Sequence, residues 1–191
     1  RGLANPETAA RNGAALACYA ELAFEWFQPQ RPAAGDVRAL AEPIDGPLVS
    51  AFRDKARELG IVVVLNLFER AGDATFDSSP VIDADGTLLG VTRMVHITEY
   101  ACFHEQGYYA PGDRGAPVFR TRAGNVGVAI CYDRHFPEYM RALALAGKPV
   151  TPIQVYTAAK QLLDGSKIRE SGVMRDYVNE FTVLRNLRSA G

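Results

Sequence analysis

A predicted helix followed at once by a strongly apolar strand constrains the fold of this chain more than any other feature. Pro47 opens the helix, apolar residues recur in it at a three-to-four spacing, and Gly60 ends it. The run Ile61–Phe68 comes next and is typical of a buried strand. The same alternation predicts a helix over 6–12, strands over Ala15–Ala20, Ser79–Ile82 and Leu88–Met94, a hairpin turn over 83–86, and a helix over Pro137–Ala146 that covers the sheet. The pattern predicts an α/β layered domain, either a doubly wound sheet or a stacked sandwich.

The composition indicates one domain with no strong electrostatic preference for a partner. Of the 191 residues, 48% are hydrophobic, which suffices for one substantial core. A formal net charge of -1 gives no overall basic field, so we expect no binding to nucleic acid or to a membrane surface. The longest apolar run is too short to span a bilayer, and the amino terminus lacks the pattern of a signal peptide. We therefore expect a soluble cytoplasmic protein.

The cysteine, histidine and glycine patterns indicate no metal and no cofactor. The three cysteines form neither a disulfide framework nor a Cys-x-x-Cys site, so a reducing compartment is expected. Three histidines and scattered carboxylates form no recognisable ligand set. The glycines at positions 112, 115, 124 and 127 do not follow a phosphate-loop pattern.

Cys131 is the strongest candidate for a reactive group. It follows the apolar run Val126–Ile130 and precedes Tyr132–Glu138, which predicts a strand, a sharp turn and a helix that opens at Pro137. A thiol near the amino end of a helix is favoured as thiolate. The alternative is a small buried hydrophobic residue, because free cysteine is among the most buried residue types.

The segment around Cys131 resembles the nucleophile motif of the nitrilase superfamily, the carbon-nitrogen hydrolases. Further segments resemble that family in the same order along the chain, and the resemblance covers residues 5–147 only. These segments are Ala20–Phe24, with Ala20 in place of the usual proline, Gly60–Val64, Ser79–Asp83, Gly90–Arg93 and His104–Asp113.

The resemblance implies an αββα sandwich of the nitrilase type that lacks its first strand and most of its second half. Residues 1–147 are then a partial carbon-nitrogen hydrolase domain, and residues 148–191 are a helical segment of unrecognised origin. Amphipathic patterns predict two helices in that segment, Ile153–Leu163 and Val173–Leu187. Family members commonly associate through such sandwiches, so the resemblance also implies that a homo-oligomer can form.

The chemistry implied by the resemblance is hydrolysis through a cysteine thioester. Cys131 attacks the carbonyl carbon, Glu21 takes the thiol proton and later activates water, and Glu105 holds the site in register. The backbone N–H of Tyr132 is a candidate oxyanion donor. A base such as Glu21 needs a poorly hydrated pocket to raise its pKa. The apolar neighbours expected to form that pocket are Leu22, Phe24 and Trp26.

One position departs from the family pattern at its catalytic lysine. The usual Tyr-Arg-Lys-x-His reads Thr92–His96 here, so Met94 occupies the lysine position. A thioether has no N–H to donate, and removing one oxyanion donor costs on the order of a hundred-fold in rate. Strand alternation places Arg93 on the opposite face, where it cannot substitute. Two hypotheses follow: a hydrolase of N-carbamoyl amides or ω-amides, or a catalytically impaired scaffold that binds a partner through its carboxyl-terminal helices.

Two features of the sequence favour different substrates. Arg134, just after the nucleophile, can clamp a carboxylate bidentately with help from His135, as related motifs do in β-ureidopropionase-like amidases that act on N-carbamoyl amino acids. Alternatively, both residues cap the following helix or pair with Asp133 or Glu138. The stretch His104–Asp113 instead resembles the substrate-facing loop of N-carbamoylputrescine amidases, which favours a cationic small-molecule ligand.

Overall fold

The computed structural model describes residues 4–147. The predicted helices Ile153–Leu163 and Val173–Leu187 lie outside the described residues, so the interpretation of residues 148–191 stays a prediction. Within residues 4–147, no helix is long and apolar enough to cross a bilayer.

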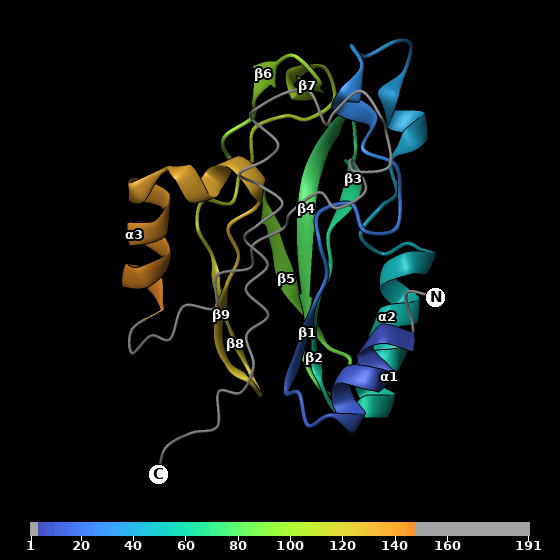
Figure 1. The fold of residues 1–191 in the computed structure, drawn as a ribbon, viewed down its shortest axis with the longest axis vertical. Helices are drawn as coiled ribbons and strands as arrows, with labels where there is room; N and C mark the ends of the chain where they lie inside the picture. The colour runs from blue at the N-terminus through green and yellow to red at the C-terminus, as the bar shows by residue number, and fades with distance from the viewer. Residues whose placement is uncertain (1–3, 148–191) are drawn as a thin grey trace.

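A five-stranded mixed sheet forms the centre of the described chain (Figure 1). Its longest strand, β4 (Ala74–Ile82), is antiparallel to its three partners. These partners are β2 (Val62–Val64), β3 (Leu67–Ala71) and β5 (Leu88–Arg93). The short strand β1 (Leu16–Cys18) is parallel to β2 at one edge. The predicted turn joins β4 to β5, with the Asp83 N–H donating to the Thr87 carbonyl at 2.8 Å.

The predicted strand Ile61–Phe68 is interrupted, which corrects the sequence prediction. Strands β2 and β3 follow one another along β4 and are separated by Leu65 and Asn66. Asn66 lies between the two strands, and its side-chain Oδ1 accepts a hydrogen bond from the backbone N–H of Leu22 at 2.7 Å. Strand β4 also starts before the predicted Ser79, since residues 74–78 pair with β3 across a tight turn that contains Gly72 at φ 63°.

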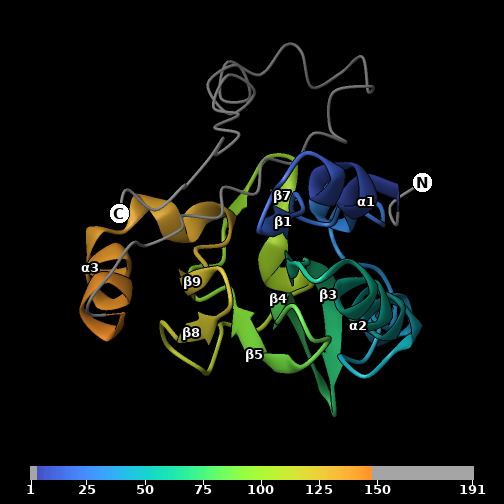
Figure 2. The ribbon, with the colours of Figure 1, turned by 90° about the horizontal axis from the view of Figure 1, so that it is seen from below.

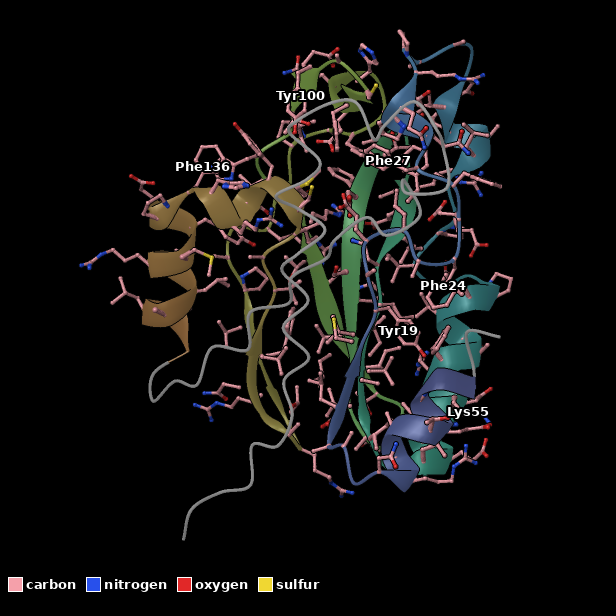
Figure 3. All side chains as sticks on the ribbon, in the orientation of Figure 1. Tyr19, Phe24, Phe27, Lys55, Tyr100 and Phe136 are labelled. Carbon is pink, nitrogen blue, oxygen red and sulfur yellow. The ribbon has the colours of Figure 1, made fainter. Side chains whose placement is uncertain are left out.

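Two helices cover one face of this sheet. Helix α2 (Pro47–Leu59) matches its predicted bounds and ends at Gly60, which adopts the left-handed conformation of a helix cap. Helix α1 (Ala4–Arg11) lies beside it (Figures 1 and 2), and Lys55 of α2 pairs with Glu7 of α1 at 2.9 Å. Tyr19 and Phe24 pack between this pair of helices and the sheet, with Tyr19 5.1 Å from the ring of Phe52 (Figure 3).

A β-hairpin and a third helix lie on the opposite side of the sheet (Figures 1 and 2). Strands β8 (Val118–Thr121) and β9 (Gly124–Gly127) form the hairpin. Its apolar residues share a core with the central sheet, and helix α3 (Pro137–Ala146) packs on the outer side of the hairpin. The described residues therefore stack as helix, sheet, sheet and helix, which confirms the α/β layered class.

Two local predictions near Cys131 need correction. The predicted strand Val126–Ile130 ends at Gly127, and the next three residues are buried without strand pairing. Helix α3 was expected to cover the main sheet, but it contacts β8 through a cluster that includes Leu143 and Val118. The hairpin supplies the nearer apolar surface, and it separates α3 from the main sheet.

The remaining elements are short and connect these layers. Strands β6 (Glu99–Tyr100) and β7 (Phe103–His104) form a small hairpin beyond β5. Four 3-10 helices complete the described chain: η1 (Gln28–Gln30), η2 (Val37–Leu40), η3 (Glu105–Gly107) and η4 (Cys131–His135).

Candidate active site

Three predicted site residues meet at one buried point between the layers. One oxygen each of Glu21 and Glu105 and the sulfur of Cys131 all lie within 4.8 Å of one another. Glu21 lies in the turn after β1, Glu105 opens η3, and Cys131 opens η4. Both glutamates are buried, at 3% and 0% exposure. The fold thus brings together three side chains that are more than a hundred positions apart at the extremes.

The backbone is strained at one of the three positions and directly next to another. Cys131 has φ 44°, and Leu22, next to Glu21, has φ 47°. Residues other than glycine rarely occupy this left-handed region, and such strain persists only where the surroundings enforce it. The hydrogen bond from the Leu22 N–H to Asn66 is one such constraint. Strained backbone therefore fixes the directions in which Glu21 and Cys131 project.

Asp77 joins the cluster, although sequence reasoning missed it. Its side chain is fully buried on β4 and accepts from Asn66 Nδ2 at 2.5 Å. Asp77 is also close enough to Glu21 to raise the pKa of that carboxyl. Asp77 lies two residues before Ser79, where the predicted strand began, so the prediction left Asp77 outside the strand.

Burial shifts the pKa values of the whole cluster upward. Desolvation, and then the neighbouring Asp77, raise the pKa of Glu21 well above its usual value. Desolvation raises the pKa of Asp77 to about 7 and also raises that of Glu105. Burial and then the charge of Glu21 raise the pKa of the Cys131 thiol. Desolvation and the carboxyl neighbours therefore oppose the thiolate that we expected at a helix start.

Asp133 anchors the turn that carries Cys131, a role that sequence reasoning did not assign. Its buried carboxylate accepts from the backbone N–H groups of Val95 and His96 and lies 2.7 Å from His96 Nδ1. The His96 ring stacks on Phe136 at 3.5 Å. Asp133 therefore ties the chain after β5 to the start of α3, with Cys131 two residues away.

Met94 and Arg93 project to opposite faces of the sheet, as strand alternation predicts. Arg93 is paired with the buried Glu69 at 2.6 Å and with Asp113 at 2.9 Å. Met94 is fully buried in the core on the other face, in the cluster against which Cys131 packs. Arg93 thus supplies no charge to the site.

The other predicted residues lie at the surface side of the Cys131 turn or farther away. Tyr132 and Arg134 are half-buried in η4, and His135 is exposed, with its ring 5.5 Å from that of Tyr132. Trp26 does not contribute to a pocket around Glu21, because it is 76% exposed. Phe24 packs with Tyr19 on the helix-covered face, so of the three expected apolar neighbours only Leu22 joins the core on the Cys131 side.

Within the described residues, the side chains that could together hold a metal ion are those of this same cluster. Glu21, Glu105 and Cys131 combine two hard oxygen donors with one soft sulfur donor. Ligands must lose their protons to bind a metal, and the raised pKa values in this cluster oppose that loss. The arrangement favours proton transfer to and from a thiol.

Comparisons with known proteins match the chain to one family. The carbon-nitrogen hydrolase family model matches residues 3–176, which extends past residue 147, where we expected the resemblance to end. N-carbamoylputrescine amidase from Solanum lycopersicum is 44% identical over 111 residues, which cover 58% of this chain and 37% of that protein. Beta-ureidopropionase from Arabidopsis thaliana is 34% identical over 113 residues, which cover 58% of this chain and 28% of that protein.

The fold agrees with these sequence relatives. The crystal structure of a carbon-nitrogen hydrolase from Helicobacter pylori G27 has a TM-score of 0.73 and 25% identity, covering 92% of this chain and 62% of that one. The chain spans well under half the length of the two sequence relatives. A family model that matches most of the residues, together with a shared layered fold, decides the relationship. The chain belongs to the carbon-nitrogen hydrolase family.

Proposed function

We propose that this chain carries the site of a thiol-dependent hydrolase that cleaves non-peptide carbon-nitrogen bonds in N-carbamoyl amides or ω-amides. The observation that supports the proposal most directly is the convergence of Glu21, Glu105 and Cys131 within 4.8 Å. A nucleophile within reach of a carboxyl base is the arrangement that covalent catalysis requires. The names of the N-carbamoylputrescine amidase and beta-ureidopropionase relatives favour a carbamoyl nitrogen as the leaving group.

In the proposed reaction, the sulfur of Cys131 attacks the carbonyl carbon while Glu21 accepts the thiol proton. Glu21 then gives this proton to the departing nitrogen, and a thioester remains on Cys131. Water attacks the thioester, with Glu21 taking its proton, and the thiol is restored. The raised pKa of Glu21 suits this exchange, since it makes the carboxyl a better acceptor for the thiol proton.

Glu105 has a positioning role in this proposal. Its Oε2 accepts from the backbone N–H of Thr98 at 3.0 Å, so its carboxyl is held beside the thiol. The N–H of Tyr132 is the proposed oxyanion donor, because the first N–H groups of a helical turn have no acceptor within that turn. Arg134 and His135, both in η4, are proposed to contact the distal end of the substrate.

A second candidate function is a catalytically impaired scaffold that binds a partner. The buried Met94 favours it, because a thioether at the family's lysine position cannot stabilise an oxyanion. The segment proposed to bind the partner, residues 153–187, lies outside the described residues.

Ammonia release from a substrate panel separates the two functions. The panel contains N-carbamoyl amino acids, N-carbamoylputrescine and simple amides, and each is tested with the full chain and with Cys131→Ala. Cys102→Ala is the matched control, because Cys102 is also a cysteine outside any disulfide but is exposed. Release that Cys131→Ala abolishes and Cys102→Ala retains supports the hydrolase. No release from a chain that is folded by circular dichroism supports the scaffold.

A further inference from the structure

The buried cluster at Cys131 has an excess of acidic groups. The groups whose charges most affect Cys131 are the carboxyls of Glu21, Glu105 and Asp77. One carboxyl oxygen of each is buried and receives no hydrogen bond from a donor in residues 4–147. These oxygens are Glu21 Oε1, Asp77 Oδ2 and Glu105 Oε1. Buried acceptors without donors are costly, so a ligand that brings N–H groups and positive charge would be stabilised here.

The protein supplies no obvious cation to this face of the sheet in its described part. Met94 lies across from Asp77, and its thioether carries neither charge nor N–H. The nearest strand cation, Arg93, is held on the other face by Glu69 and Asp113. His96, on the following chain, is held by Asp133.

This charge balance discriminates between two kinds of electrophilic carbon. Attack of a thiol on a neutral carbonyl creates an oxyanion, which nearby carboxylates destabilise. Attack on a guanidinium carbon instead consumes a positive charge and produces a neutral adduct. Three carboxyls around the thiol therefore favour binding of the guanidinium, and the attack needs no oxyanion donor.

We infer that the thiol site accepts an N-alkylguanidinium and hydrolyses it faster than the matching N-alkylurea, an inference that rests on the thiol-hydrolase function proposed above. The guanidinium N–H groups donate to the buried oxygens of Glu105, Glu21 and Asp77, and the cation favours the ionised form of these carboxyls. The planar cation presents its central carbon to the sulfur of Cys131.

The reaction balances with water as the co-reactant. Glu21 takes the proton of Cys131, and the sulfur bonds to the guanidinium carbon to give a neutral tetrahedral adduct. Glu21 returns the proton to one NH2 group, the carbon-nitrogen bond breaks, and ammonia leaves a cationic S-alkylisothiouronium group on Cys131. Water adds to that carbon and gives a proton to Glu21. The carbon-sulfur bond then breaks, the second proton of the added water returns to sulfur, and an N-alkylurea is released. Glu21 gives the proton that it took from water to the solvent, where it converts the ammonia to ammonium.

Matched pairs of compounds test the inference on the full chain. Each pair carries either a guanidino or a ureido group on the same alkyl chain, with a methyl, a carboxylate or an amino group at the far end. We expect ammonia release from guanidino members, together with the corresponding urea in the mass spectrum, and loss of both in Cys131→Ala. Faster release from the ureido members would overturn this inference and leave the proposed hydrolase intact. No Cys131-dependent release from either member, by a folded chain, would overturn both.

Two substitutions test the electrostatic cause. Met94→Lys adds an ammonium on the face of Asp77 and is expected to lower the guanidino rate relative to the ureido rate by about a hundred-fold. Leu145→Lys is its control, since it adds the same charge at an exposed site on α3 and leaves the ratio unchanged. Asp77→Asn, which removes one carboxylate without changing size, tests the same cause if Met94→Lys fails to fold. An unchanged rate ratio in folded Asp77→Asn or Met94→Lys would contradict the electrostatic cause.

Discussion

The backbone N–H of Met94 donates to the carbonyl oxygen of Asp77 at 2.9 Å. This contact continues the β4–β5 ladder one position past the Ser78–Arg93 pair, so the side chains of Met94 and Asp77 lie on the same face. The carboxyl of Asp77 therefore lies opposite the thioether of Met94 across the ladder. The pair therefore makes the site more acidic than a lysine at position 94 would.

Asp77→Asn should remove a pH dependence of stability. Burial raises the pKa of Asp77 from 3.8 to about 7, so the folded state binds more protons than the unfolded state between these pH values. The free energy of unfolding should consequently fall as pH rises from about 4 to about 7 and then level off. The variant cannot lose this proton, so its slope should be smaller and its stability at pH 8 higher, on the order of a few kcal/mol.

Urea denaturation at a series of pH values measures this slope. Asp73→Asn is the matched control, because the side chain of Asp73 is fully exposed and its removal should leave the slope unchanged. A slope in Asp77→Asn equal to that of the parent chain would show that Asp77 is already ionised at low pH in the folded state.

Cys131 should react slowly with a thiolate-specific reagent although it is not fully enclosed. Burial and the carboxyl neighbours raise the pKa of its thiol, and only the thiolate is nucleophilic. Iodoacetamide at pH 8 should therefore label the exposed Cys102 before Cys131. Peptide mass spectrometry over time gives both rates, and the two should become similar in urea. Faster labelling of Cys131 in the folded chain would mean that the thiolate is stabilised.

Asp133→Ala should destabilise the protein and misplace the nucleophile. The substitution removes the acceptor for the backbone N–H groups of Val95 and His96, and unsatisfied buried groups cost about 1–3 kcal/mol each. We expect the free energy of unfolding to fall by roughly 2–5 kcal/mol. Glu138→Ala, an exposed carboxylate in the same region, should change it by less than about 0.5 kcal/mol. Equal effects of the two variants in thermal denaturation would refute the anchoring role.

Arg93→Met should be strongly destabilising because it leaves the buried Glu69 without its charge partner. The Arg93–Glu69 pair is bidentate, and both side chains are nearly inaccessible to solvent. Breaking such a pair from one side costs about 3–5 kcal/mol. Asp113→Asn removes the other, exposed partner of Arg93 and should cost about 0–1 kcal/mol. A small effect of Arg93→Met in chemical denaturation, comparable with that of Asp113→Asn, would mean that the buried Arg93–Glu69 pair contributes little to stability.

Local sequence determined the elements whose cause is local. Helix α2 begins at Pro47 and ends at Gly60, and α3 begins at Pro137, because proline and glycine fix backbone angles whatever the surroundings. The hairpin turn between β4 and β5 follows from the same kind of preference. Motif resemblance also indicated Glu21, Glu105 and Cys131 as one site, and the structure places one side-chain atom of each within 4.8 Å of the others.

Only the tertiary structure decided which other groups share that site and what charge they carry. Asp77 enters because β4 pairs with β3 over five residue pairs, a long-range register that no local pattern encodes. Trp26 is exposed and Asp133 is buried for the same reason, since neighbours from distant segments set the burial of each side chain. The pKa of the Cys131 thiol depends on burial and on three carboxyls from different parts of the chain. The sequence therefore identified the thiol, whereas the packing around it determined the direction in which its pKa shifts.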